Sequence, residues 1–199
     1  MVDEKRLYLP IIDALGAKIQ KGLDAEKLGI CYLENTSSKI FSNKLQRVFD
    51  DEALFFLKVE GVYPDITGYI APPTLPQFFD YTDCKIIVVE VKDEEIKIKH
   101  IYQVKQQAEF LRADYAFLIS SEEISPRIIR FMGKRPEILF FTSWNPKTRA
   151  RTIKRILIAQ FDEKNKSVRL DEKLYGEYLR VPWFEPFRFR SSRKLFRTR

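Results

Sequence analysis

The sequence predicts an α/β fold in which a mixed β-sheet is flanked by helices. Short runs rich in Ile, Val and Phe alternate with segments whose apolar residues recur at helical spacing. Two of the runs, residues 53–60 and 65–71, are separated by a tight turn with Gly and Pro, which predicts an antiparallel hairpin. Strands that alternate with helices after an initial hairpin are typical of a mixed sheet.

Length and composition limit the class of protein. A chain of 199 residues suits one domain with an appendage or two small domains. Hydrophobic residues make up 45% of the chain and charged residues 32%, which favours a folded protein over a disordered one. No apolar run approaches the about 20 residues that cross a bilayer, so no membrane partner is expected. Cys31 and Cys84 are too few for a disulfide framework, are expected to be buried, and suit a reducing cytoplasm.

The first part of the chain contains two predicted helices and three predicted strands. A helix is expected over residues 3–20, with Pro10 in its first turn, because apolar residues recur there at helical spacing: Leu7, Ile11, Leu15 and Ile19. A second helix is expected over residues 38–51, with Ser38 as its cap. Strands are expected at 53–60, 65–71 and 85–92, and the prolines of residues 72–83 predict an irregular loop before the third strand.

The second part alternates between helices and strands. An apolar stripe predicts a helix over residues 98–113, and an apolar run predicts a strand over 115–120. Pro126 and Gly133 suit the start and end of a helix over 125–133. The remaining predicted elements are a strand at 137–142 and a hairpin formed by 153–161 and 167–170.

Positive charge is concentrated near the C-terminus. Residues 147–199 hold 16 Lys and Arg against 6 Asp and Glu, a net charge of +10. Because the whole chain carries +7, the preceding 146 residues carry −3. We therefore divide the chain into an α/β core, residues 1–142, and a basic C-terminal extension, residues 143–199, packed on the core. Such a one-sided distribution predicts a polyanionic partner, although surplus basic residues can also serve only to keep a surface soluble.

The end of the extension interleaves aromatic residues with basic ones. Arginine binds phosphate, and aromatic rings can stack on bases or fix a segment to the core. The residues expected to bind nucleic acid are Arg188, Arg190, Arg193 and Lys194.

Charged residues mark one edge of the predicted sheet. Side chains alternate along the strand at 85–92, so Glu90 and Lys92 point to the same face near its end. Asp65 stands at the bend of the predicted hairpin, where it could lie alongside them. Two close carboxylates repel each other unless a cation lies between them, and Mg²⁺ prefers oxygen ligands of this kind. With a lysine to orient or help deprotonate a metal-bound water and to stabilise developing charge, such a set predicts phosphodiester hydrolysis.

The order Pro64-Asp65, then Glu90-Val91-Lys92 on an Ile/Val strand, then a helix and a short strand, resembles the PD-(D/E)xK superfamily of restriction endonuclease-like nucleases. The resemblance covers roughly residues 40–142 and implies a restriction endonuclease-like core with Mg²⁺- or Mn²⁺-dependent nuclease activity on DNA. Asp65 and Glu90 would hold the metal, with the Val91 carbonyl as a further ligand. Lys92 would be the catalytic lysine. Members often dimerise to cut two strands, so the resemblance also implies a homodimer as one assembly.

The helix at 98–113 adds a further candidate. Gln103 and Gln107 are one turn apart and share a face. Some exonuclease branches of the superfamily carry a Gln followed four residues later by a Tyr. Gln103 matches that Gln and is included among the candidate catalytic residues, whereas Gln107 stands in place of the Tyr. The alternative is that both amides lie on a solvated helix face, where His100 is also expected to be a surface residue.

Several alternatives stay open at this point. Many superfamily members carry an acid on a helix before the first strand, and four residues qualify: Asp13, Glu34, Asp50 and Asp51. Duplex and single-stranded DNA, and endonuclease or exonuclease action, are all compatible with the pattern, and an RNA-processing nuclease is a third, weaker hypothesis. The competing hypothesis is a nucleic-acid-binding module that keeps this fold without cleaving. Under either hypothesis the slightly acidic core leads us to expect the basic segment, residues 147–199, beside the Asp65–Lys92 edge.

Overall fold

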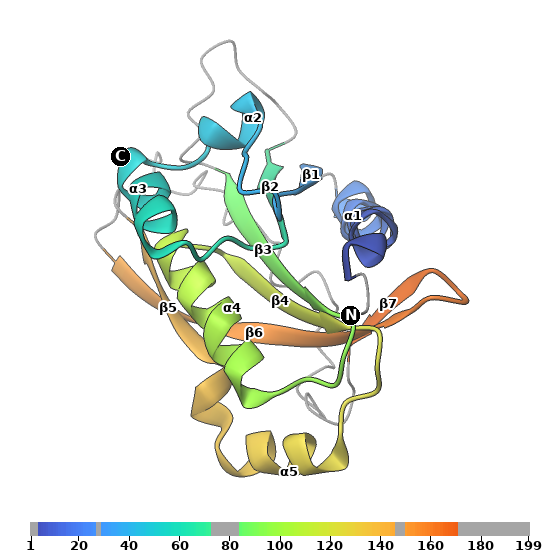
Figure 1. The fold of residues 1–199 in the computed structure, drawn as a ribbon. Coiled ribbons are helices and arrows are strands. Elements are labelled where there is room, and N and C mark those ends of the chain that lie inside the picture. The colour runs from blue at the N-terminus through green and yellow to red at the C-terminus, as the bar shows by residue number, and fades with distance from the viewer. Residues whose placement is uncertain (1–3, 27–28, 73–83, 146–149, 171–199) are drawn as a thin grey trace, which may run out of the picture.

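The computed structural model of the chain describes residues 4–26, 29–72, 84–145 and 150–170, and it has an α/β architecture. A mixed sheet of seven strands separates α1 on one face from α3 and α4 on the other (Figure 1). The helical elements are η1 (Glu4–Leu7), α1 (Tyr8–Glu26), α2 (Asn43–Gln46), α3 (Asp51–Glu60), α4 (Ile98–Phe110), α5 (Pro126–Lys134) and η3 (Pro136–Leu139), where η marks a 3-10 helix. The strands are β1 (Ile30–Asn35), β2 (Ile66–Ala71), β3 (Lys85–Lys92), β4 (Tyr115–Ser120), β5 (Phe140–Asn145), β6 (Ala150–Asp162) and β7 (Ser167–Leu170).

The sheet brings the ends of three strands to one edge. Its order is β1-β2-β3-β4-β6-β5, and β7 also pairs with β6. The pairs β1/β2, β2/β3 and β5/β6 are antiparallel, whereas the central pairs β3/β4 and β4/β6 are parallel. Lys92 therefore lies beside Ser120, and Ser120 lies beside Gln160. The carboxyl edge of parallel strands is where α/β proteins commonly bind ligands.

Each face of the sheet has its own apolar core. On one face α1 buries Ile11, Leu15 and Ile19 at helical spacing against β3 and β4. On the other face α4 packs its own apolar stripe against Val88 and its neighbours. Because side chains alternate along β3, Val89 and Val91 face α1 whereas Val88 and Glu90 face α4. Glu90 thus enters the α4 side of the sheet from an otherwise apolar strand.

The predicted strand at 53–60 is wrong, because these residues form the helix α3. The Asp50 side chain accepts a hydrogen bond from the Ala53 N–H and caps the helix, and Asp51 follows in the first turn. Gly61 ends the helix at φ 67°, in the left-handed region that glycine favours, and its N–H donates to the Leu57 carbonyl. These local end signals outweigh the strand preference of the Phe and Val residues between them.

The helix predicted at 38–51 is also wrong. Apart from Asp51, which begins α3, only the four residues of α2 are helical there, and the Ser42 hydroxyl caps them by accepting from the Leu45 N–H. The partner of β2 is instead β1, a strand that we did not predict, and Thr67 pairs with Glu34. The predicted hairpin of 53–60 with 65–71 is therefore replaced by an antiparallel β1/β2 pair from more distant segments.

Gly68 in β2 packs tightly against the backbone of β1. A Cβ atom on Gly68 would lie 2.0 Å from the Tyr32 carbonyl oxygen, which the backbone cannot accommodate without shifting. We expect Gly68→Ala to lower the free energy of unfolding by about 3 kcal/mol, as overpacking does in a tight site. Gly133→Ala is the matched control, because nothing lies within 4 Å of its Cβ position in α5. Gly133→Ala should stabilise the fold by about 0.5 kcal/mol. Urea unfolding measures both variants, and equal unfolding midpoints for the two would contradict this account.

Most of the remaining predictions agree with the structure. The strands at 85–92 and 115–120 have the predicted bounds, and α4 and α5 lie within about one turn of their predicted ranges. The strand predicted at 137–142 is partly wrong, because Pro136 begins the short helix η3 and β5 starts only at Phe140. The β6/β7 hairpin is confirmed.

The predicted extension contributes to the sheet itself. Residues 143–145 belong to β5, and β6 lies between β4 and β5 in the sheet. Most of the loop at 72–83, and all four C-terminal residues expected to bind nucleic acid, lie outside the described residues. Within the described ranges, no helix has both the length and the apolar character needed to span a bilayer.

Candidate active site at the end of strand β3

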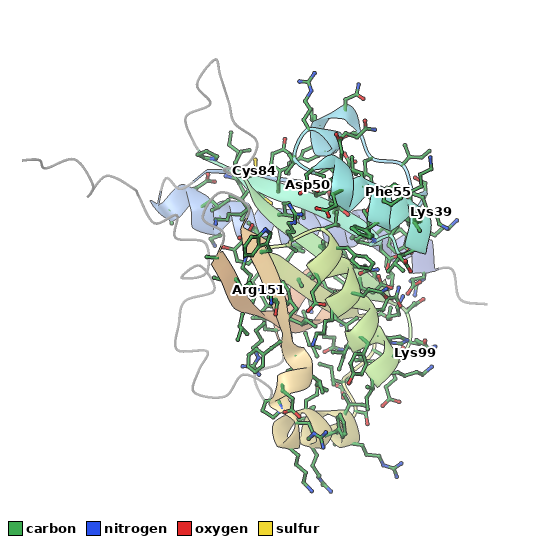
Figure 2. All side chains as sticks on the ribbon, turned by 90° about the vertical axis from the view of Figure 1, so that its left-hand side faces the viewer. Lys39, Asp50, Phe55, Cys84, Lys99 and Arg151 are labelled. Carbon is green, nitrogen blue, oxygen red and sulfur yellow. The ribbon has the colours of Figure 1, made fainter. Side chains whose placement is uncertain are left out.

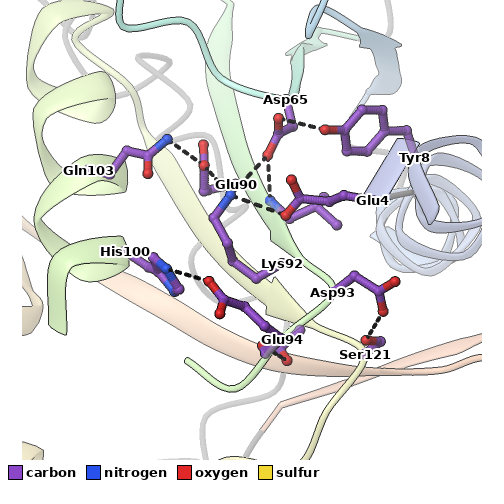
Figure 3. Close-up of polar contacts among 12 residues, drawn as sticks. Glu4, Tyr8, Asp65, Glu90, Lys92, Asp93, Glu94, His100, Gln103 and Ser121 are labelled. Atoms are coloured by element: carbon purple, nitrogen blue, oxygen red, sulfur yellow. Dashed lines mark hydrogen bonds and ion pairs between the residues drawn. The ribbon is translucent and has the colours of Figure 1, made fainter. Parts of the chain in front are cut away.

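Three carboxylates surround one ammonium group at the carboxyl edge of β3 (Figure 3). The Lys92 Nζ lies 2.7 Å from Glu90 Oε1 and 3.9 Å from Asp65 Oδ2. Glu4, in η1, brings its Oε1 to 3.2 Å from the same nitrogen. The predicted residues Asp65, Glu90 and Lys92 therefore converge, joined by a carboxylate that the sequence analysis did not single out.

Asp65 is fixed from both of its carboxylate oxygens. The Val91 N–H donates to Oδ2 at 2.8 Å, and the Tyr8 hydroxyl donates to Oδ1 at 2.9 Å. The backbone of Asp65 is held as well, because its carbonyl accepts from the Thr36 N–H just after β1. Burial raises the pKa of Asp65, and the Val91 N–H, the Lys92 charge and the Tyr8 hydroxyl oppose that rise. The carboxylate is thus oriented toward β3 in a fixed position.

Glu90 is the most buried of the three acids. Only 1% of its surface is exposed. Burial, together with the nearby charge of Asp65, raises its pKa to about 7, although Lys92 and Gln107 act in the opposite direction. A carboxyl group that titrates near neutral pH in a charged cluster is typical of functional sites.

Two amides of α4 hold Glu90 in place. The Gln103 Nε2 donates to Oε1 at 2.5 Å, and the Gln107 Nε2 donates to Oε2 at 2.7 Å. Gln107 is fully buried and also donates to the Tyr63 carbonyl. The solvated helix face considered for this pair is therefore wrong. Gln107 was not among the predicted site residues, although its position one turn after Gln103 was a usable signal.

Lys92 is charged in this arrangement. Burial acts to lower its pKa, but the carboxylates of Glu90, Asp65 and Glu4 outweigh burial and the net pKa is raised. A protonated lysine donates hydrogen bonds and stabilises negative charge, and it does not accept a proton from water. Of the two roles considered for Lys92, charge stabilisation fits this geometry.

Glu4 and Tyr8 are functional candidates that the sequence analysis missed. They lie four residues apart across the junction of η1 and α1, so they share one helical face. The four upstream acids considered earlier lie elsewhere: Asp13 is exposed, Glu34 accepts from the Tyr32 hydroxyl and the Ser42 N–H, Asp50 caps α3, and Asp51 lies in its first turn. The (i, i+4) acid–tyrosine pair at the start of a predicted helix was the one available signal.

Arg6 fastens the segment that carries Glu4 to the sheet edge. Its guanidinium forms ion pairs with Asp93 at 3.0 Å and with Glu163 at 2.5 Å. Asp93 follows β3 directly, and Glu163 lies in the turn between β6 and β7. Through the β6–β7 turn, part of the basic segment therefore lies beside the carboxyl end of β3. Residues 171–199 lie outside the described residues, so their expected position stays a prediction.

His100 is buried, so the expectation of a surface histidine is wrong. Its Nδ1 accepts a hydrogen bond from the Lys97 N–H, which satisfies a backbone donor just before the first turn of α4. Its Nε2 lies 3.2 Å from Glu94 Oε1, to which the neutral ring donates. Burial lowers the pKa of His100 to about 4, so the ring is neutral at pH 7 and serves the helix start. Among the cysteines, Cys84 is buried as expected, whereas Cys31 is half-buried.

Tyr8→Phe tests the support given to Asp65. Loss of the hydroxyl should raise the pKa of Asp65, because that hydrogen bond lowers it. If deprotonated Asp65 is needed for activity, the acidic limb of a kcat/KM–pH profile moves to higher pH by up to about one unit, because the lost hydrogen bond is worth about 1 kcal/mol. Tyr102→Phe, on the exposed side of α4, is the matched control. An unchanged acidic limb in Tyr8→Phe would contradict this role.

The oxygen atoms at this edge fit a hard divalent cation. In the part of the chain that the structure describes, no group of three or more His, Cys, Asp or Glu side chains is arranged as a metal centre. Mg²⁺, however, commonly uses one or two carboxylates with water. Asp65 and Glu90 already share a cation, the Lys92 ammonium. Because the N–H and C=O of a strand residue face the same neighbour, the Val91 carbonyl points toward the Asp65 side.

Comparison with known proteins adds no further identification. No protein-family model matches the chain, and no curated protein or solved structure matches it significantly.

Proposed function

We propose that this chain is a divalent-cation-dependent phosphodiester hydrolase acting on DNA, built on a restriction endonuclease-like core. The observation that carries the proposal is the convergence of Asp65 and Glu90 on the Lys92 ammonium at the carboxyl edge of β3. Burial of unpaired charge is costly, and an acid–acid–lysine cluster with a carboxyl pKa of about 7 is chemically useful where a phosphate and a cation bind.

The metal would be held by the carboxylates of Asp65 and Glu90 and by the Val91 carbonyl. When bound, Mg²⁺ or Mn²⁺ supplies Lewis-acid polarisation of a phosphoryl oxygen and lowers the pKa of the attacking water. Binding requires deprotonated carboxylates, so the raised pKa of Glu90 makes the affinity for the metal increase with pH up to about pH 8.

The protein side chains have separate roles in this proposal. Lys92, freed from part of its carboxylate contacts, donates to a non-bridging phosphate oxygen and stabilises the charge that develops there. Gln103 and Gln107 hold both oxygens of Glu90, so the carboxylate keeps its orientation while the substrate reacts. Tyr8 and the Val91 N–H do the same for Asp65. Preorganised groups of this kind contribute without reorganising during the reaction.

Cleavage assays test the proposal directly. The full chain is incubated with supercoiled plasmid, single-stranded DNA and RNA of the same sequence, in Mg²⁺, in Mn²⁺ and in EDTA. We expect DNA cleavage with either metal and none in EDTA, and Asp65→Asn should reduce the rate by about 10³-fold. Equal cleavage by wild type and Asp65→Asn would contradict the site assignment. Faster cleavage of RNA than of DNA would mean that RNA is the substrate, and the assignment of the site residues would stand.

Asp114→Asn is the matched control. Asp114 lies just before β4, at the amino-terminal ends of the parallel strands, far from the site at their carboxyl ends. Asp114 accepts from the Ile86 N–H at 3.0 Å and from the Lys154 ammonium at 2.6 Å, which resembles the backbone and lysine contacts of Asp65. It should retain wild-type cleavage per folded molecule. DNA binding without cleavage under any condition would favour the alternative, a nucleic-acid-binding module that does not cleave.

A further inference from the structure

The helix α5 presents a stripe of basic residues to solvent. Arg127, Arg130 and Lys134 are exposed, and Phe131 is 37% exposed. These positions follow the i, i+3, i+4, i+7 spacing that places side chains on one face of a helix. In Figure 2 the helix lies at the foot of the molecule, and side chains project from it away from the sheet. The basic stripe is therefore a continuous feature of one surface.

The opposite face of α5 is used by the protein core. Met132 is 1% exposed, and Ile128 and Ile129 pack against the core on the α4 side of the sheet. Ser125 caps the first turn by accepting from the Arg127 N–H, and Pro126 stands at the start. This packing fixes the direction in which the stripe points.

The stripe also differs from other basic residues because it has no acidic partner among the described residues. Arg112 pairs with Asp50 and Glu52, and Arg135 pairs with Glu137. By contrast, Arg127, Arg130 and Lys134 form no ion pair with the described residues, and α5 contains no acid. Their charge is therefore available to an external polyanion.

The start of α5 lies close to the candidate active site along the chain. Ser121 donates its N–H to the Lys92 carbonyl at 3.1 Å. Pro126 follows five residues later, so its Cα can lie no more than about 18 Å from that of Ser121. One strand of nucleic acid covers this distance in about five nucleotides. A strand that crosses the site can therefore reach α5.

We propose that Arg127, Arg130 and Lys134 of the stripe on α5 bind the phosphate backbone of a nucleic acid beside the site at the end of β3. The three charged positions are spaced by about 4.5 and 6 Å along the helix, within reach of neighbouring phosphates. The choice of nucleic acid rests on the proposed function. An anionic membrane fits less well, because a membrane-binding helix buries its apolar face in lipid, and in α5 that face is already packed on the core.

Binding measured without a divalent cation tests this surface independently of cleavage. Fluorescence anisotropy of a labelled 20-base-pair duplex is recorded in EDTA over a range of KCl concentrations, using wild type and the triple variant Arg127→Gln, Arg130→Gln, Lys134→Gln. Loss of three phosphate contacts should reduce the slope of log K against log[KCl] by about 2.7 and weaken binding at 0.1 M salt by about 500-fold. A slope that falls by one or less would overturn the proposal.

The control variant carries the same change of charge on α1, α2 and α3. Lys21→Gln, Lys44→Gln and Lys58→Gln replace exposed lysines and should keep the wild-type slope. Equal losses in both triple variants would show a net-charge effect and overturn the assignment to α5. Vesicles of anionic lipid are assayed in parallel, and a loss of vesicle binding with unchanged duplex binding would assign α5 to membranes instead. If binding changes as expected while no condition gives cleavage, the proposed function fails and this surface stands.

Discussion

Glu90→Gln is expected to abolish cleavage, with a loss of at least about 10³-fold, and to make the fold more stable at alkaline pH. The amide cannot provide the charged ligand that a divalent cation requires. The new amide oxygen still accepts from one of the two donors, Gln103 or Gln107, and the amide of the other must flip so that its oxygen accepts from the new N–H2 group, which largely keeps the shape of the site. Activity and stability should therefore change in opposite directions.

The stability effect follows from the raised pKa of Glu90. An ordinary glutamate has a pKa of 4.5, and burial raises that of Glu90 to about 7 in the folded state. Between these values the folded state holds the proton more tightly than the unfolded chain, so stability falls as pH rises from about 4.5 to about 7. At pH 8 the accumulated loss is up to about 3 kcal/mol, and Gln avoids it.

Urea unfolding at pH 5 and pH 8 measures this effect. Wild type should lose stability between the two values by more than Glu90→Gln does. Glu95→Gln is the control, because Glu95 is exposed near the same strand end. The account of Glu90 is contradicted if both variants show the wild-type pH dependence, or if Glu90→Gln still cleaves DNA.

Lys92→Met should lower both activity and stability, and divalent cations should restore part of the stability. Without the ammonium, the carboxylates of Glu90, Asp65 and Glu4 repel one another in a largely buried site. Removal of one member of such a cluster costs about 3 kcal/mol. Cleavage should fall by about 10²-fold or more, because charge on the reacting phosphate loses its donor.

The response to Mg²⁺ distinguishes this from simple loss of an ion pair. A cation that binds the carboxylates takes the place of the ammonium charge, so millimolar Mg²⁺ should raise the melting temperature of Lys92→Met more than that of wild type. Lys154→Met removes the comparable lysine beside Asp114 at the other edge. It should also be less stable, but its melting temperature should respond to Mg²⁺ as that of wild type does. Equal Mg²⁺ responses in all three proteins would rule out this role for the cluster.

The strands that carry the site could be predicted because their signals are local. β3 and β4 are short apolar runs with clear ends, and the period of two places Glu90 and Lys92 on one face. The prediction that Asp65 lies beside Glu90 and Lys92 was correct, but the hairpin from which it was inferred does not exist. The predicted partner strand is the helix α3, and β1 occupies the pairing position and holds the Asp65 backbone through Thr36.

The rest of the site depends on contacts between residues far apart in the chain. Tyr8 reaches Asp65 across 57 residues, and Glu4 reaches Lys92 across 88. No local pattern specifies such contacts, because they follow from how α1 packs on the sheet. Gln107 and His100 are different cases. Polar residues on an exposed helix face and on a buried one look alike in sequence, and only the docking of α4 on β3 shows that these two face inward.

Binding of Mn²⁺ to the full chain, measured by electron paramagnetic resonance, tests the central claim most directly. The claim is that the Asp65–Glu90 edge holds one divalent cation that supports phosphodiester hydrolysis. We expect wild type to bind one Mn²⁺ that excess Mg²⁺ displaces, with affinity increasing from pH 6 to pH 8 as Glu90 loses its proton. Asp65→Asn and Glu90→Gln should lose this binding, and Asp114→Asn should retain it. Stoichiometric binding that survives both Asp65→Asn and Glu90→Gln, or no binding to wild type at all, would contradict the claim.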